Sequence, residues 1–186
     1  MGDKSKIETK RPERMRQFMP DVWLGVTVEN QAMADERIPI LLATPAANRF
    51  ISIEPMLGPI DFSQIPRPEQ FHRQPYGWHN YWPKKLHWVI VGGESGPNAR
   101  PMHPDWARSI RDQCQAASVP FFFKQWGEWC PRGQDAPLDD WGNDEKYPAR
   151  MFAGTATHPA KLMLRVGKKK AGRLLDGVEH SAFPAT

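Results

Sequence analysis

The segment that decides the fold spans residues 86–127 and reads LHWVIVGGESGPNARPMHPDWARSIRDQCQAASVPFFFKQWG. It opens with a β-branched and apolar run at 86–91 and closes with a second apolar run at 119–123, and polar residues follow each run. Between them, residues 105–117 carry an apolar side chain at every fourth position, which is the spacing of one helix face. Strand, helix and strand in this order predict two parallel strands joined by a crossover helix.

The same unit occurs earlier in the chain. Residues 22–28 form an apolar, β-branched run that ends in Glu29 and Asn30, as a buried strand does when it reaches a polar rim. Asn30 is a suitable N-cap for a helix that ends near Thr44, because the proline that follows Thr44 disfavours helical backbone there. Residues 49–53 are a further apolar strand. The sequence therefore predicts an α/β protein built on a parallel sheet.

The composition along the chain suggests three regions. Residues 1–21 are polar and basic and are expected to be a lead-in with a short helix. Residues 22–130 hold the strands and helices, interrupted at 58–85 by an insertion in which prolines alternate with aromatic residues. Residues 131–186 are expected to be irregular, with a short strand at 162–167.

Several polar residues and glycines follow the predicted strands directly. The carboxyl ends of parallel strands meet at one edge of a sheet, and binding residues gather there. Carboxylates, a lysine and a glycine pair at one edge therefore predict a binding site, although strands also end in glutamate simply because they reach water. The candidate binding residues are Glu29, Asn30, Glu54, Gly92, Gly93, Glu94, Ser95 and Lys124.

The glycine pair is the most informative part of this set. Gly92 and Gly93 remove side chains where a ligand could come close, and exposed amides at such a turn can hold an anion. A tight turn is the alternative explanation. Further on, Arg100 and His103 precede the helix and are weaker candidates for reaching over the same edge.

Composition excludes several classes of protein. The 186 residues carry 25 Lys and Arg against 21 Asp and Glu, a net charge of +4, which is mild for a nucleic-acid-binding protein. No run approaches the eighteen or so apolar residues of a membrane span. The first residues lack the apolar core of a secretory signal, so we expect a cytoplasmic protein. Cys114 and Cys130 stand alone, so we expect buried side chains and no metal site.

Five blocks of this sequence carry a resemblance to a known family. They are Val22 to Gln31, Ala34 to Pro39, Phe50 to Gly58, Trp88 to Gly96 and Phe122 to Gly127. In this order they closely resemble a bacterial and phage family of unknown function, named after phage gene products thirty-seven and sixty-eight. That family is similar to the radical S-adenosylmethionine enzymes. The resemblance runs from about Thr9 to Gly177, and it suggests a prophage or mobile-element origin.

The resemblance also shows what this chain lacks. Family members carry a cysteine motif for a four-iron cluster and further barrel strands between segments that resemble Lys4 to Glu8 and Thr9 to Met15. Here Glu8 is followed directly by Thr9. The chain thus looks internally deleted. The resemblance implies half of a TIM-like βα barrel with an open edge, no iron-sulfur cluster in this chain, and part of an S-adenosylmethionine pocket at the candidate residues. Homo-oligomers, or a complementing chain, are expected at the open edge.

Three functional hypotheses remain open. The first is this truncated, radical-S-adenosylmethionine-like protein, inactive alone and of unknown substrate. The second is a nucleic-acid-associated phage module that uses the aromatic insertion, from Trp78 to Lys85, together with Lys168 to Lys170. The third is a cluster-free enzyme with Glu54 or Glu94 as base and Lys124 as electrophile. Catalytic residues are not specified by the spacing.

Overall fold

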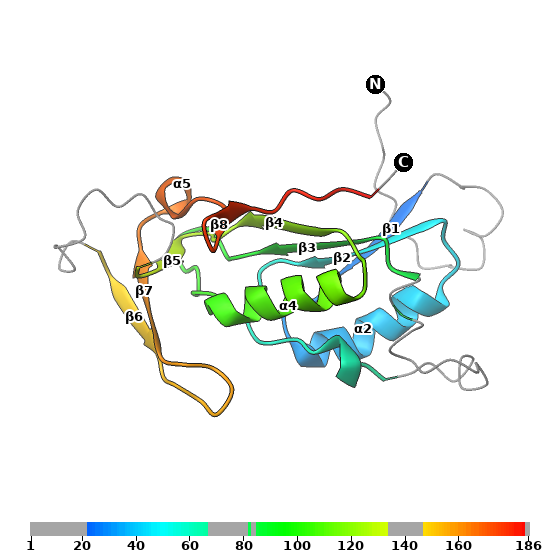
Figure 1. The fold of residues 1–186 in the computed structure, drawn as a ribbon, viewed down its shortest axis with the longest axis horizontal. Helices are drawn as coiled ribbons and strands as arrows, with labels where there is room; N and C mark the ends of the chain where they lie inside the picture. The colour runs from blue at the N-terminus through cyan, green and yellow to red at the C-terminus, as the bar shows by residue number, and fades with distance from the viewer. Residues whose placement is uncertain (1–21, 67–81, 83–84, 134–146, 185–186) are drawn as a thin grey trace, which may run out of the picture.

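A computed structural model describes residues 22–66, 82, 85–133 and 147–184 (Figure 1). Its centre is a four-stranded parallel sheet in the order β1-β2-β3-β4, with consecutive strands as neighbours. The elements of this part are β1 (Trp23–Thr27), α2 (Gln31–Ala43), β2 (Asn48–Ile53), η1 (Phe62–Gln64), β3 (Trp88–Gly92), α4 (Pro104–Ala116) and β4 (Phe121–Gln125). The predicted α/β class and the four parallel strands are confirmed.

The two predicted helices also form, and the expected cap of α2 is present. The Asn30 side chain accepts a hydrogen bond from the Met33 N–H at 3.1 Å, which satisfies one of the free amides of the first turn. The helix ends before Thr44, as the sequence indicated. None of the helices in the described part of the chain has the length and apolar character needed to cross a membrane.

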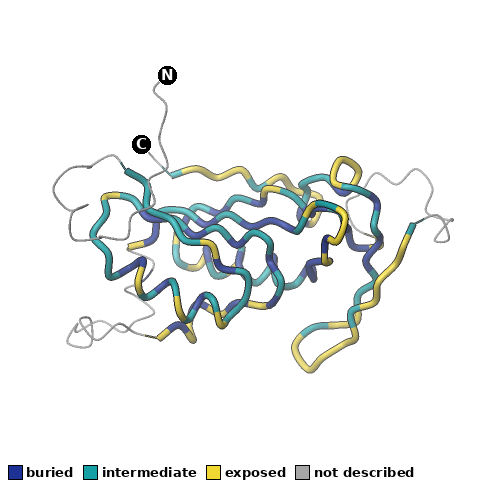
Figure 2. Tube along the Cα trace, turned by 180° about the vertical axis from the view of Figure 1, so that it is seen from behind, coloured by how far each residue is buried: buried dark blue, intermediate teal, exposed yellow. Residues whose placement is uncertain are grey.

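Both long helices cover the same face of the sheet (Figure 1). The strand side chains on that face are sealed from water, and Ile51, Val89 and Phe123 are each 0% exposed. Residues on the other face, such as Phe50 and Trp88, are only partly buried. Buried and partly buried stretches accordingly lie side by side in the sheet (Figure 2). The sheet thus has one dry face and one face that no long helix covers.

The C-terminal region is more regular than the sequence indicated. A three-stranded antiparallel sheet, in the order β5-β7-β6, follows the parallel sheet. The predicted strand at 162–167 forms as β7, and the hairpin of β8 and β9 turns at Asp176 and Gly177, which both have positive φ. The elements are β5 (Trp129–Pro131), β6 (Ala149–Phe152), β7 (Lys161–Arg165), α5 (Lys168–Ala171), β8 (Leu174–Leu175) and β9 (Val178–Glu179).

The two edges of the parallel sheet differ. The segment after β9 pairs with β4, because the Phe123 N–H donates to the His180 carbonyl at 2.9 Å and Phe122 forms an antiparallel bridge with Ser181. Among the described residues, no strand pairs with the outer edge of β1. Within the described part of the chain, the open edge of the parallel sheet is therefore on the β1 side.

Part of the predicted insertion at 58–85 belongs to the core. Ile60, Phe62 and Ile65 are buried, and the Phe62 ring packs against Trp82, with ring centroids 4.8 Å apart. Residues 67–81 and 83–84 lie outside the described residues, as does the lead-in at 1–21. The structure therefore does not address the predicted short helix of the lead-in.

A buried arginine joins β2 to the C-terminal end of α2. Arg49 is 8% exposed, and its guanidinium donates to the carbonyls of Leu41 and Thr44 at 2.6 to 3.1 Å. These carbonyls belong to the last turn of α2 and its cap, where a positive charge also complements the helix dipole. Arg49 therefore fixes the helix against the strand that follows it.

We predict that Arg49→Met lowers the free energy of unfolding by about 2 kcal/mol, because buried carbonyls lose a charged donor. Urea unfolding followed by far-ultraviolet circular dichroism measures the change. Arg150→Met, at an exposed position of β6, is the control and should cost less than about 0.5 kcal/mol. Equal losses in the two variants would contradict a capping role for Arg49.

Candidate functional site

An ion pair crosses the sheet at the carboxyl ends of its strands. Lys124, at the end of β4, lies with its Nζ 3.2 Å from Oε2 of Glu54, which follows β2. The Ser52 hydroxyl donates to the same Oε2 at 3.4 Å. The Lys124 side chain is 52% exposed and the Glu54 side chain 18% exposed, so solvent or a ligand reaches the pair.

Gly92 makes this crossing possible. It ends β3, the strand that lies between β2 and β4. A Cβ placed on Gly92 would lie 2.4 Å from Oε1 of Glu54, closer than real Cβ atoms approach any heavy atom. Because glycine has no side chain, the Glu54 carboxylate can extend over β3 to Lys124. The structure thus brings together three of the predicted residues, one from each of three strand ends.

Gly93 is required by backbone packing. A Cβ at this position would lie 1.9 Å from the Trp126 carbonyl oxygen. The Gly93 N–H donates to the Gln125 carbonyl at 2.9 Å, so this amide is already used within the fold. The close approach of the two strand-end loops explains Gly93 without a ligand.

Glu29 and Asn30 lie at the end of β1 and are engaged in local structure. Both oxygens of Glu29 lie 3.2 to 3.4 Å from Arg37 Nη1 on α2. The Glu29 carbonyl accepts from the Leu57 N–H at 2.7 Å. The Asn30 side chain caps α2, as described above. Glu29 and Asn30 therefore link the end of β1 to α2 and to the segment that follows β2.

Glu94 and Ser95 follow β3 and are also paired. Arg100 donates to both Glu94 oxygens through its side chain and to Oε2 through its main chain, at 2.7 to 2.8 Å. The hydrogen bonds from the Arg100 side chain hold the pKa of Glu94 below its usual value. The Ser95 hydroxyl accepts from Gln125 at 3.3 Å. Arg100, a weaker candidate from the sequence, thus serves to fix the loop after β3.

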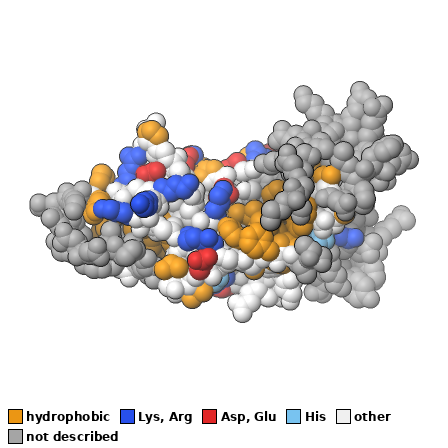
Figure 3. Space-filling model, turned by 90° about the horizontal axis from the view of Figure 1, so that it is seen from above, with side chains coloured by type: hydrophobic (Ala, Val, Ile, Leu, Met, Phe, Trp, Pro, Cys, Tyr) orange, Lys and Arg blue, Asp and Glu red, His pale blue; other side chains and the backbone are white. Residues whose placement is uncertain are grey.

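An aromatic cluster covers the helix-free face beside this ion pair. Trp88 lies at its centre, with ring centroids 6.3 Å from Trp23, 5.8 Å from Phe122 and 5.0 Å from Phe183. Phe50 lies 6.4 Å away, over Gly25. Figure 3 shows hydrophobic side chains gathered near the middle of the surface seen from above. The sequence analysis did not predict this cluster. Its signal was that the strands are apolar at consecutive positions, which places apolar side chains on both faces of the sheet.

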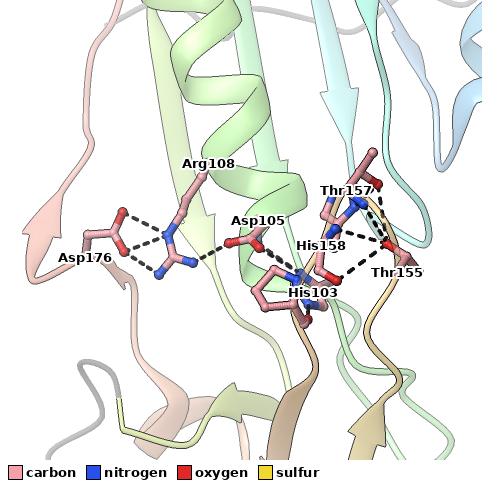
Figure 4. Close-up of polar contacts among 8 residues, drawn as sticks. His103, Asp105, Arg108, Thr155, Thr157, His158 and Asp176 are labelled. Carbon is pink, nitrogen blue, oxygen red and sulfur yellow. Dashed lines mark hydrogen bonds and ion pairs between the residues drawn. The ribbon is translucent and has the colours of Figure 1, made fainter.

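A second polar network, at the N-terminus of α4, is structural. Nδ1 of His103 accepts from the Asp105 N–H at 3.1 Å and caps the helix, so its Nε2 donates to the Pro159 carbonyl, also at 3.1 Å (Figure 4). His103 is 2% exposed, and burial lowers its pKa. The weak prediction that His103 reaches over the sheet edge is wrong, because both ring nitrogens hold the backbone.

The same network continues to the β8–β9 hairpin (Figure 4). Arg108 contacts Asp105 on α4 at 2.5 Å and reaches Asp176 at 2.6 Å. Arg111 approaches the other Asp176 oxygen at 2.7 Å. Hydrogen bonds from Arg108 and Arg111 lower the pKa of Asp176 to about 2. The two arginines therefore tie the C-terminal hairpin to α4.

The described residues do not provide an iron-sulfur site. Both cysteines are buried, and burial raises the pKa of Cys114 to about 12 and that of Cys130 to about 11. A cluster needs several thiolates, whereas burial here favours the protonated thiols. Among the described residues, no group of three or more His, Cys, Asp or Glu is placed to hold a metal ion. These two cysteines do not fit a cluster.

These features define an α/β protein with a charged pair at the strand ends of a parallel sheet. The chain belongs to a family described as proteins of unknown function, DUF5131, which it matches over residues 4–184. The predicted membership of an uncharacterised family is thereby confirmed. No curated protein matches the chain, and no solved structure does.

We predict that Gly92→Ala destabilises the protein by about 1 to 2 kcal/mol, because the new methyl group must push the Glu54 carboxylate away. The cost should fall below about 0.5 kcal/mol when Glu54 is replaced by alanine. A double-mutant cycle on urea unfolding measures this coupling. Additive costs would show that Gly92 does not serve the Glu54 crossing.

We predict a pH-dependent contribution from Asp176. Its pKa is about 2 in the folded protein against an ordinary value of 3.8, so its stabilisation is present above about pH 4 and is lost as the pH falls towards 2. Because Asp176 is partly exposed, Asp176→Asn should cost about 1 kcal/mol at pH 6. Urea unfolding of both proteins at several pH values measures the difference. A difference that does not shrink between pH 4 and pH 2 would contradict this assignment.

Proposed function

We propose that the four parallel strands, with helices α2 and α4, are one half of a TIM-like barrel that retains part of an S-adenosylmethionine pocket. Two observations support a half barrel over a doubly wound sheet. The strands are parallel and follow one another in chain order, and both long helices lie on one face. In a barrel the helices form an outer ring and the other face of the sheet points inward. The helix-free face would then be the barrel interior.

The ion pair of Glu54 and Lys124 carries the proposal for the pocket. The methionine part of S-adenosylmethionine has an ammonium and a carboxylate, which Glu54 and Lys124 respectively can bind. The pair is partly exposed at the edge where α/β proteins bind ligands. Of the other candidates, Gly92 gives Glu54 its path, and Glu29, Asn30, Gly93, Glu94 and Ser95 shape the rim around it.

The proposed protein is a ligand-binding remnant that is inactive alone. Radical cleavage of S-adenosylmethionine needs an electron from a cluster, and the two cysteines of this chain do not fit one. The proposal therefore includes an internal deletion after Glu8 and an origin in a phage or prophage gene. Its physiological substrate is not specified by these residues.

A complementing chain would have to join on the β1 side. The segment at 180–182 already pairs with β4, so that edge is not available to extend the sheet. Two copies that pair through β1 about a twofold axis would place the two strands antiparallel and give an open sheet of eight strands. A parallel barrel therefore requires a different partner chain, whereas a homodimer is expected to be an open sheet.

Within the aromatic insertion, the one ring that the structure describes between residues 78 and 85 does not support the nucleic-acid hypothesis. Trp82 is buried in the core against Phe62, so it is not a stacking platform. Residues 78–81 and Lys84 lie outside the described residues.

The test is thermal unfolding of the full chain with S-adenosylmethionine, followed by near-ultraviolet circular dichroism. A ligand that binds only the folded state raises its stability, by about 2.7 kcal/mol at a hundred times Kd. We expect the midpoint to rise with S-adenosylmethionine but not with methylthioadenosine, which lacks both charged groups of the amino acid.

Variants identify the residues involved. Glu54→Gln and Lys124→Met should each remove most of the shift, whereas Arg150→Gln, at an exposed position of β6, should leave it unchanged. A midpoint that the ligand does not move, or a shift that both site variants retain, would overturn the proposed pocket.

A further inference from the structure

The positive charge of this protein is concentrated at its C-terminal end. Residues 147–184 carry seven Lys or Arg against two Asp or Glu, a net charge of +5, whereas the whole chain has +4. The three lysines of α5, Lys168 to Lys170, are all exposed. Lys and Arg side chains gather beside the hydrophobic patch on the surface seen from above (Figure 3). Such a concentration attracts polyanions.

Aromatic rings lie beside one of these charges, the guanidinium of Arg173. Phe183 is 62% exposed, and its ring lies 5.3 Å from Phe122 and 5.0 Å from Trp88. The Arg173 guanidinium lies over the Phe122 ring at 5.2 Å. Arg173 also contacts Glu179 at 3.3 Å, and its Nε has no hydrogen-bond partner among the described residues. A cation and an exposed ring therefore meet at one place on the surface.

Backbone contacts hold the exposed ring in a fixed position. The Trp88 indole N–H donates to the Ala182 carbonyl at 2.9 Å, one residue before Phe183. The Ala182 N–H donates to the Phe121 carbonyl at 3.3 Å, so the segment is part of the sheet. A large exposed ring normally reduces solubility. Here two hydrogen bonds hold the residue before Phe183 in place, so the exposed ring keeps a fixed position. A rigid ring loses little entropy when a flat partner stacks on it.

We propose that the surface at Arg173 and Phe183 binds single-stranded nucleic acid, together with the exposed lysines Lys168 and Lys169 of α5, which precedes Arg173 in the chain. Lysines beside exposed rings are the combination that such partners need, because the backbone phosphates meet the charges and the bases stack on the rings. An unpaired strand is required, since bases within a duplex do not expose their faces to a flat surface. The proposal is independent of the proposed S-adenosylmethionine pocket, because it uses none of the residues in that pocket.

Two features favour a nucleic acid over an anionic membrane. Membrane-surface binding usually relies on an amphipathic helix with an apolar face that enters the lipid. Here α5 has four residues, three of them lysines, and its alanine is buried. The exposed ring instead belongs to a segment paired with the parallel sheet, which is suited to stacking.

The test measures fluorescence anisotropy of a labelled sixteen-residue oligothymidine with the full chain at several salt concentrations. We expect the binding affinity to fall as salt rises. The slope of the logarithm of the binding constant against the logarithm of salt concentration reports phosphate contacts, each of which contributes about −0.7. Lys168→Gln combined with Lys169→Gln should lower both the affinity and the slope. A duplex of the same length should bind at least about tenfold more weakly.

A matched pair of variants tests the stacking. Phe183→Ala should weaken binding about tenfold without changing the salt slope, since one base loses its ring. Ile40→Ala is the control, because Ile40 is also 62% exposed but lies on α2, and it should leave affinity unchanged. Near-ultraviolet circular dichroism verifies that every variant is folded.

Three results would overturn the proposal. The first is an oligonucleotide affinity that the lysine substitutions leave unchanged. The second is equal loss from Phe183→Ala and Ile40→Ala. The third is binding to vesicles of anionic phospholipid with none to the oligonucleotide, which would assign the surface to a membrane. Loss of S-adenosylmethionine binding alone would not bear on this surface.

Discussion

The rest of this structure depends on the one-sided burial of its parallel sheet. Side chains of β2, β3 and β4 that point towards α2 and α4 are sealed from water, and each fully buried apolar side chain contributes about 1.5 to 3 kcal/mol. The opposite face has no long helix over it, so its rings remain partly exposed. The charged pair extends across this face and the aromatic cluster covers it. Both proposals for binding therefore arise from the same asymmetry.

At the carboxyl ends of the strands, close backbone packing lies next to the candidate site. The two adjacent glycines at the end of β3, Gly92 within the strand and Gly93 directly after it, serve different purposes. Gly92 leaves a path for a carboxylate from the neighbouring strand, and Gly93 allows a carbonyl from the loop after β4 to approach. A bulge between Val91 and Gly92 shifts the register of β3 against β4 at the same place. Each of the three rim carboxylates has a basic partner, since Glu29 pairs with Arg37, Glu94 with Arg100 and Glu54 with Lys124.

The C-terminal region gives the sheet an asymmetric environment. The segment after β9 covers the β4 edge and adds Phe183 to the exposed rings, while Arg108 and Arg111 hold the preceding hairpin through Asp176. The small antiparallel sheet fixes the loop after β3, since the Trp129 indole N–H donates to the Ala99 carbonyl at 2.7 Å. This region therefore decides which edge of the sheet a partner can reach and where positive charge is displayed.

The sequence by itself determined the parallel strands, the two long helices, the Asn30 cap and the membership of an uncharacterised family. Those features depend on local patterns: apolar runs, a helical period and a capping side chain. Only the tertiary structure decided which candidate residues meet. Glu54 pairs with Lys124 because the fold places two strand ends together. Arg100 pairs with Glu94, and His103 caps α4, because of the geometry of the loop after β3. The sequence predicts residues 131–186 to be irregular apart from one short strand, because strands of two to five residues leave too short a pattern to recognise before their partners are known.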